Sequence, residues 1–178
     1  MRREIQPAEH TDISSALFFS VMMSAFFPTR FYDLRPAEVV LDNFTPGKAS
    51  LTDLPFADNS IASLSCMHVV EHIGLGRYGD AIDPDGDLKA MAELERVLAK
   101  GGSLLFVVPI SGRPRIQFNA HRIYSYAQIV ESFPGLELVD FALIPELPAD
   151  GGLTKSATQA MADNESYGYG CFWFRKPL

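Results

Sequence analysis

The distribution of apolar residues predicts short strands that alternate with helices. Strand-like apolar runs occupy residues 10–13, 30–33, 49–52, 61–70, 103–109, 136–144 and 167–175. Helical patterns occupy residues 16–27, 87–100 and 125–134. Strands that are apolar throughout, separated by segments of helical length, indicate a mostly parallel sheet that is covered on both faces.

Two of the helices carry signals at their ends. Residues 87–100 repeat apolar side chains at helical spacing, and Gly101 with Gly102 is expected to close that helix. Ser125 and Gln128 have the spacing of a capping box, which predicts a helix start. No clear helix separates the last two strands, so we expect an antiparallel pair at the end of the chain.

Residues 16–27 form the longest apolar run of the chain. A bilayer span needs about 20 residues, and the run is shorter than that. The acidic residues Glu9 and Asp12 precede it, whereas a signal peptide begins with a basic leader. We interpret the run as a core helix closed by Pro28, and we expect no membrane partner.

Composition narrows the class of protein. The 178 residues are 47% hydrophobic, which is the length and content of one domain, spanning residues 1–178. A net charge of −7 argues against a nucleic-acid partner, since phosphate recognition depends on clustered Lys and Arg. Cys66 and Cys171 lie in apolar stretches and form no disulfide framework, so we expect a reduced, cytoplasmic setting.

Ligands of parallel α/β sheets bind beyond the carboxyl ends of the strands. The candidate segments are therefore residues 12–15, 33–35, 50–53, 68–72 and 109–115. Asp33 follows a strand about 20 residues after the first loop, where an acidic side chain can bind a ribose diol. An N-cap or an ion pair with Arg35 is the alternative role for Asp33.

The middle of the chain carries a set of motifs: Leu54-Pro55-Phe56, Asp58, Ser60, Glu71-His72, Glu93 or Glu95, Arg96-Val97-Leu98 and Gly101-Gly102. Together they resemble the middle of class I S-adenosylmethionine-dependent methyltransferases. Residues 68–88 and 118–126 are similar to a bacterial family of short methyltransferase-like proteins. The resemblance spans residues 10–176. It implies a three-layer Rossmann-like α/β fold with a seven-strand sheet and a reversed last strand.

The resemblance also implies S-adenosylmethionine as cofactor and a set of residues around it. These residues are Asp12, Ser14, Asp33, Ser50, Leu51, Thr52 and His68. The first loop departs from the family because it has no glycine, and Ser50 stands where the family tends to carry an acid. Ordinary helix capping is the alternative role for Asp12 and Ser14.

The segment His68-Val-Val-Glu71-His72 allows three interpretations. The resemblance places it in a methyltransferase pocket, where His72 or His121 is the candidate base and Glu71 orients it. H-x-x-E-H is also the zinc signature of one peptidase group, but the following Gly74 and Gly76 leave little helix to present the ligands. A capped turn without chemistry is the third interpretation. We expect no metal.

Polar residues beyond this segment are candidates for binding the acceptor. They are Arg77, Tyr78, Arg115, Asn119 and Arg122. The acids at 83, 85 and 87 lack the glycine of a calcium loop, and we expect them to cap the next helix.

The sequence therefore predicts methyl transfer to an oxygen or nitrogen of a small polar or anionic acceptor. A methyltransferase-fold binding or regulatory subunit without catalysis is the alternative, motivated by Ser14 and Ser50, and a zinc hydrolase is the third. A homodimer formed through the aromatic residues 167–174 is compatible with the sequence.

Overall fold

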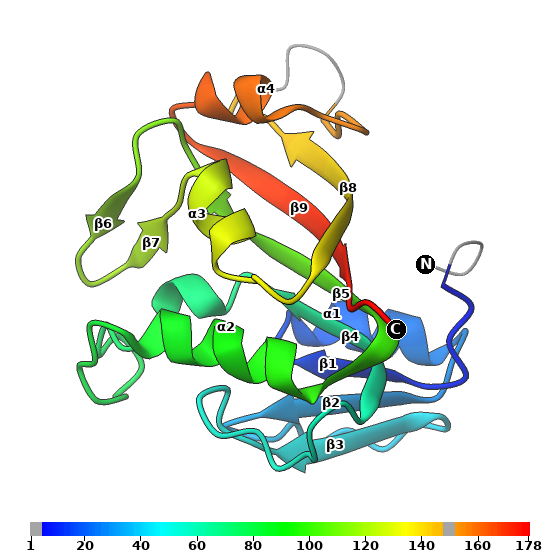
Figure 1. Ribbon diagram of the computed structural model, residues 1–178. Coiled ribbons are helices and arrows are strands. Elements are labelled where there is room, and N and C mark those ends of the chain that lie inside the picture. Colours follow the sequence, from blue (N-terminus) through cyan, green and yellow to red (C-terminus); the bar gives the residue numbers. More distant parts are fainter. Residues whose placement is uncertain (1–4, 148–151) are drawn as a thin grey trace.

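The computed structural model describes residues 5–147 and 152–178, which form a seven-stranded sheet (Figure 1). The strand order is β3-β2-β1-β4-β5-β9-β8, and β9 runs antiparallel to the other six strands. The strands are β1 (His10–Ile13), β2 (Thr29–Asp33), β3 (Phe44–Lys48), β4 (Ile61–Met67), β5 (Leu98–Ile110), β8 (Glu137–Ile144) and β9 (Gly168–Arg175). The predicted three-layer α/β fold with its reversed last strand is confirmed.

The helices cover both faces of this sheet. They are α1 (Leu17–Ser24), α2 (Gly86–Val97), α3 (Tyr126–Glu131), α4 (Gln159–Asp163) and a 3₁₀ turn, η1 (Val70–His72). The crossovers β1–α1–β2 and β4–α2–β5 leave the sheet centre in opposite directions, and right-handed crossovers then put α1 and α2 on opposite faces. In Figure 1, α2 and α3 lie in front of the sheet and α1 lies behind it. A separate hairpin is formed by β6 (Arg115–Gln117) and β7 (His121–Ile123).

The main core lies between the sheet and the α2–α3 layer. Met91 and Leu94 of α2 are buried, as the helical spacing predicted. Phe172 and Phe174 of β9 are also buried and contact one another. Phe172 also contacts Phe141, Phe174 contacts Phe133, and Phe133 contacts Phe106, which makes one packed aromatic group. A homodimer through residues 167–174 would therefore use only the half-buried alternate side chains of β9.

Local predictions are wrong at strand β3, at the end of helix α2 and between strands β8 and β9. Strand β3 is Phe44–Lys48 rather than residues 49–52, because pairing with β2 holds an edge strand whose Pro46 and Gly47 carry no strand signal. Helix α2 ends at Val97, and Gly101 and Gly102 lie within β5 rather than capping the helix. The capping box of Ser125 and Gln128 is confirmed, and the short helix α4 separates β8 from β9 where the pattern showed none.

The apolar run at residues 16–27 is not a core helix. Helix α1 buries Ser20 and Ser24, while Phe18 is 69% exposed and Met22 is 56% exposed. The small serines allow close packing on the sheet, and the larger apolar side chains point away from it. Among the described residues, no helix has the length and apolar character needed to cross a membrane.

A buried polar network joins β1 to β4 at the centre of the sheet. His10 Nδ1 lies 2.8 Å from Ser63 Oγ, and His10 Nε2 lies 2.9 Å from Ser65 Oγ. Ser65 donates its own hydrogen to Asp12, so it accepts the hydrogen of His10 Nε2. Burial lowers the pKa of His10 to about 4, which keeps the imidazole neutral.

This network predicts a loss of stability in mild acid. Below its ordinary pKa of 6.5, His10 takes up a proton in the unfolded chain but not in the folded one until about pH 4. The free energy of unfolding should therefore fall by up to about 3 kcal/mol as the pH drops through this window. Urea unfolding at pH 7 and at pH 4.5 measures the change. His10→Gln should lack this component, and an equal pH dependence in both proteins would contradict the assignment.

Candidate functional site

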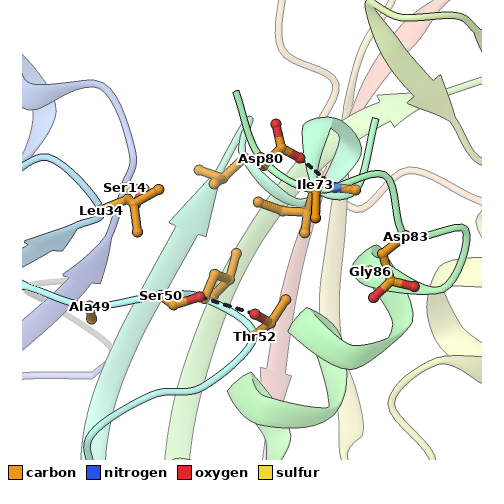
Figure 2. Close-up of a pocket in the computed structure, with 13 residues that line it drawn as sticks. Ser14, Leu34, Ala49, Ser50, Thr52, Ile73, Asp80, Asp83 and Gly86 are labelled. Atoms are coloured by element: carbon orange, nitrogen blue, oxygen red, sulfur yellow. Dashed lines mark hydrogen bonds between the residues drawn. The ribbon is translucent and has the colours of Figure 1, made fainter. Parts of the chain in front are cut away.

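The loops that follow β1, β2, β3 and β4 converge on two adjoining cavities of about 280 and 220 Å³. Five residues line both cavities: Ser14, Leu34, Val69, Ile73 and Asp80. In Figure 2, Ser14 and Leu34 face Ile73 and Asp80 across the first cavity, and Ser50 and Thr52 lie along its lower side. Together the two cavities have the size of a small-molecule site, roughly 300–1,000 Å³.

Ser14 occupies the position where the resemblance implies glycine, and it adopts a glycine-like backbone. Its φ is 57°, in the left-handed region. Its N–H and its hydroxyl both donate to the Tyr32 carbonyl, at 2.8 and 3.2 Å. The hydroxyl therefore bonds back to β2, and the missing glycine does not close the cavity.

Asp12 lies beneath this loop and lines neither cavity. Its carboxylate accepts hydrogen bonds from the N–H and hydroxyl of Ser15 and from Ser65. Burial raises the pKa of Asp12, and the hydrogen bonds oppose that effect. Helix capping does not describe Asp12 or Ser14, because the N-cap of α1 is Ala16 and it has no side-chain capping bond. Asp12 braces the loop from below.

Asp33 ends β2 and lines the second cavity. Its Oδ1 accepts the backbone N–H of Arg35 at 2.7 Å, so the interaction with Arg35 is a turn and not an ion pair. Ser50, Leu51 and Thr52 line the first cavity, and the two hydroxyls lie 3.0 Å apart.

An ordered loop, residues 74–85, forms the opposite wall. The Asp80 carboxylate accepts backbone N–H bonds from Gly74, Gly76 and Tyr78 at 2.9 to 3.4 Å. Burial opposes its ionisation, but these bonds outweigh burial and lower the pKa of Asp80. The wall is therefore held by a carboxylate that binds its own loop.

Arg122 clamps the two ends of this loop and does not line either cavity. It is buried and donates to the carbonyls of Ile73 at 2.6 Å and Pro84 at 3.1 Å. Its Nε also lies 3.3 Å from Asp87, which accepts a bond from the Tyr124 hydroxyl. Arg122 and Asp87 therefore have structural roles, because their side chains bond to the loop ends and to one another. The acids before α2 make no side-chain capping bond to it, contrary to the prediction.

The remaining candidates for acceptor binding are spread apart. Tyr78 lines the second cavity, and the guanidinium groups of Arg35 and Arg77 lie 5.9 and 5.6 Å from its ring centroid. Arg115 instead bonds to Ser111 and to the carbonyls of Arg113 and Ser166. Asn119 is exposed on the turn of the β6–β7 hairpin. Only Arg77 and Tyr78 of the predicted set lie near the cavities.

His68 and His72 flank the buried carboxylate of Glu71. His68 lines the second cavity with a left-handed φ of 60°. Its Nδ1 lies 3.4 Å from Glu71 Oε1, and His72 Nε2 lies 3.9 Å from the same oxygen. His72 Nδ1 lies 2.7 Å from the Ala120 carbonyl, to which it donates. Glu71 is 2% exposed, and its Oε2 has no hydrogen-bond partner among the described residues.

His121 and two tyrosines complete this group. The His121 ring centroid lies 6.1 Å from that of His72 and 5.9 Å from that of Tyr167. Burial, with a smaller effect of His72, lowers the pKa of His121. Burial and the neighbouring Tyr169 raise the pKa of Tyr167 to about 12. The sequence analysis missed both tyrosines as site residues, although a reversed last strand predicts that its first residues lie at the carboxyl edge of the others.

The zinc interpretation of the His68–His72 segment needs a set of ligands on a helix. The 3₁₀ turn η1 is three residues long, and His68 precedes it. Among residues 5–147 and 152–178, no group of three or more His, Cys, Asp or Glu side chains is arranged to hold a metal ion.

A family model matches a large part of this chain. The model described as "Caenorhabditis protein of unknown function, DUF268" matches residues 53–163. The chain belongs to the DUF268 family. The matched segment includes Glu71, His72 and His121 and excludes the loops after β1 and β2. No curated protein matches this chain.

Solved structures share the fold of this DUF268 chain. The YcgJ protein from Bacillus subtilis is 16% identical with a TM-score of 0.60, over 96% of this chain and 93% of that one. A Burkholderia thailandensis 1,6-didemethyltoxoflavin-N1-methyltransferase, with bound 1,6-didemethyltoxoflavin and S-adenosylhomocysteine, is 14% identical with a TM-score of 0.63, over 97% and 72%. The [4+2]-cyclase SpnF is 15% identical with a TM-score of 0.64, over 96% and 75%. These likenesses confirm the predicted methyltransferase fold.

The backbone at Ser14 leads to a stability prediction. Ser14→Gly and Ser14→Ala both lose the hydroxyl, but only alanine keeps a Cβ in the left-handed conformation. The glycine variant should be more stable by about 1 kcal/mol in urea unfolding. The same pair at Ser132, whose φ is −75°, should show the opposite order. Equal ordering at both positions would contradict the left-handed assignment.

Proposed function

We propose that this DUF268 protein binds S-adenosylmethionine in the paired cavities and transfers its methyl group to an oxygen or nitrogen of a small acceptor. The observation that carries the proposal is the convergence of the four loops after β1 to β4 on one hollow of small-molecule size. The Burkholderia methyltransferase, with its bound S-adenosylhomocysteine, supports the cofactor class.

The lining residues fit the chemistry of an adenosyl group. Asp33 keeps Oδ2 without a hydrogen bond from the described residues, which leaves an acceptor for ribose hydroxyls. Ser50, Leu51 and Thr52 offer small polar groups and backbone beside a largely apolar wall. Ser14 presents a small side chain on the first loop and lines both cavities, and His68 lines the second cavity. Asp12 would act through this loop rather than by contact.

When bound, the cofactor supplies a methyl carbon on a positively charged sulfur, ready for in-line displacement. The chain has then to orient an acceptor atom and to remove its proton where it carries one. His72 lines the second cavity, its ring centroid lies 6.1 Å from that of His121, and Glu71 lies between His68 and His72. These are the candidate groups to take up that proton. Tyr78 at the wall of the second cavity, with the Arg77 guanidinium 5.6 Å from its ring centroid, suits an acidic group on the acceptor.

A binding or regulatory subunit without catalysis is the second candidate function. Two departures from the pattern of class I methyltransferases favour it: Ser14 stands in place of a loop glycine, and Ser50 stands in place of an acid. A chain of this kind would keep the fold and would not bind the cofactor. We also propose a reduced, cytoplasmic setting, supported by the free thiols of Cys66 and Cys171.

Calorimetric titration with S-adenosylhomocysteine tests the proposal directly. The folded protein should bind it with a micromolar dissociation constant at one site per chain. Asp33→Ala should weaken binding at least tenfold, or about 1.4 kcal/mol, because the ribose loses its acceptor.

Asp42→Ala is the matched control, since Asp42 is exposed and lines neither cavity. It should bind S-adenosylhomocysteine like the unchanged protein. No heat of binding in the unchanged protein would favour the subunit without catalysis, and an unchanged affinity in Asp33→Ala would remove Asp33 from the site.

A further inference from the structure

Five aromatic side chains at the carboxyl edge of the sheet form a nearly closed circle, which we call the ring cluster. Adjacent ring centroids are 4.9 to 6.1 Å apart around it. Glu71 lies between the two ends of the circle, since its Oε1 is 3.4 Å from His68 Nδ1 and 3.9 Å from His72 Nε2. The members, in order, are His68, Tyr169, Tyr167, His121 and His72.

The carboxylate in the gap lacks a full set of partners. Glu71 Oε2 is buried without a hydrogen bond, and so is His121 Nε2. An unpartnered carboxylate oxygen in the interior is costly, and native proteins usually pair such groups. His121 is a poor counter-charge, because burial lowers its pKa and favours the neutral ring. The site therefore has negative charge to offer to a ligand.

Aromatic ring faces and a carboxylate both attract cations. The faces of tyrosine rings attract cations, and cages of such rings recognise ammonium groups. An ammonium group held there would also donate hydrogen bonds to Glu71 Oε2. A neutral hydroxyl can donate one hydrogen bond to Glu71 Oε2, but it gains neither the charge attraction nor the attraction of a cation to the ring faces. The chemistry of the ring cluster therefore suits an organic cation.

We propose that the ring cluster with Glu71 binds the protonated amino group of the acceptor, so that the methyl acceptor of this protein is an amine. This inference rests on the proposed function and deepens it by choosing nitrogen over oxygen. It makes Glu71, Tyr167 and Tyr169 acceptor-binding residues.

An ammonium group must lose a proton before its nitrogen can react. His72 already donates Nδ1–H to the Ala120 carbonyl and turns Nε2 toward Glu71. His68 instead faces Glu71 with Nδ1, so a hydrogen on Nδ1 leaves Nε2 as a free base. The proton passes from the ammonium to His68 Nε2. The freed lone pair then forms the nitrogen–carbon bond while the carbon–sulfur bond breaks and its electron pair stays on sulfur. His68 afterwards returns its proton to water.

Choline and its uncharged analogue 3,3-dimethylbutan-1-ol test the cation preference. The two have the same shape, so a purely apolar site would bind them equally. Titration followed by NMR should give at least tenfold tighter binding of choline. Glu71→Gln should weaken choline binding at least tenfold, whereas Glu137→Gln, at an exposed position of β8, should leave it unchanged. Equal binding of the two probes, or no effect of Glu71→Gln, would overturn the proposal.

A second pair of variants tests the proposal independently if Glu71→Gln does not fold. Tyr169→Phe keeps the aromatic face and should bind choline within threefold, whereas Tyr169→Leu should lose at least fivefold. His68→Gln removes one ring of the cluster and the proposed base, so it should weaken choline binding and also lower the rate of methyl transfer to alkylamines at least a hundredfold. Titration of the same samples with S-adenosylhomocysteine separates the two proposals. Cofactor binding without a preference for choline refutes only the amine site, and absent cofactor binding refutes the function itself.

Discussion

The hydrogen bond between Asp12 and Ser65 is the interaction on which the site depends. It crosses from β1 to β4, where the strand order of the sheet reverses and where only two residue pairs are in register. Ser15 extends the contact, since its hydroxyl donates to Asp12 and accepts the N–H of Met67. The loops after β1 and β4 are thereby tied together directly beneath the cavity. A buried network of this kind is rigid only while every member is paired.

Both of these loops carry a residue in a left-handed conformation. Ser14 follows β1 and His68 follows β4, and both line the cavities. Non-glycine residues in this conformation cost free energy and persist where the surrounding structure holds them. Here the bonds of Ser14 to Tyr32 and of His68 N–H to the Val107 carbonyl hold them in place. The strained backbone therefore lies at the candidate site, and the buried bonds among Asp12, Ser15 and Ser65 hold the two loops in place.

The sequence predicted the parts of the fold that follow from local pattern. Helix α2 and the capping box of Ser125 depend on spacing within one segment, and both are present. Strand β3 depends on pairing with β2, so its residues gave no signal of their own. The outward face of α1 was missed because an apolar run does not reveal which side packs.

The site residues divide in the same way. Ser50, which lies inside the predicted strand 49–52, was placed by the resemblance. Asp33 could be placed from its distance after a strand, because strand ends share one edge of the sheet. Arg122 could not, because its partners are carbonyls of residues 73 and 84, which no side-chain motif announces. The role of Asp80 could not be predicted for the same reason, because its carboxylate binds backbone N–H groups of its own loop.

The reversed strand explains why the proposed acceptor side differs in character from the proposed cofactor side. Strands β1 to β4 bring their last residues and the loops that follow them to the edge, which makes a hollow lined by small polar and aliphatic side chains and, among the described residues, no aromatic ring. Strand β9 runs the other way and brings its first residues, with Tyr169 paired to Pro109 near the end of β5. Tyr167 and Tyr169 thus meet His68 and His121 from the opposite chain direction. The antiparallel strand β9 therefore places bulky rings beside a cavity that the loops after four parallel strands form.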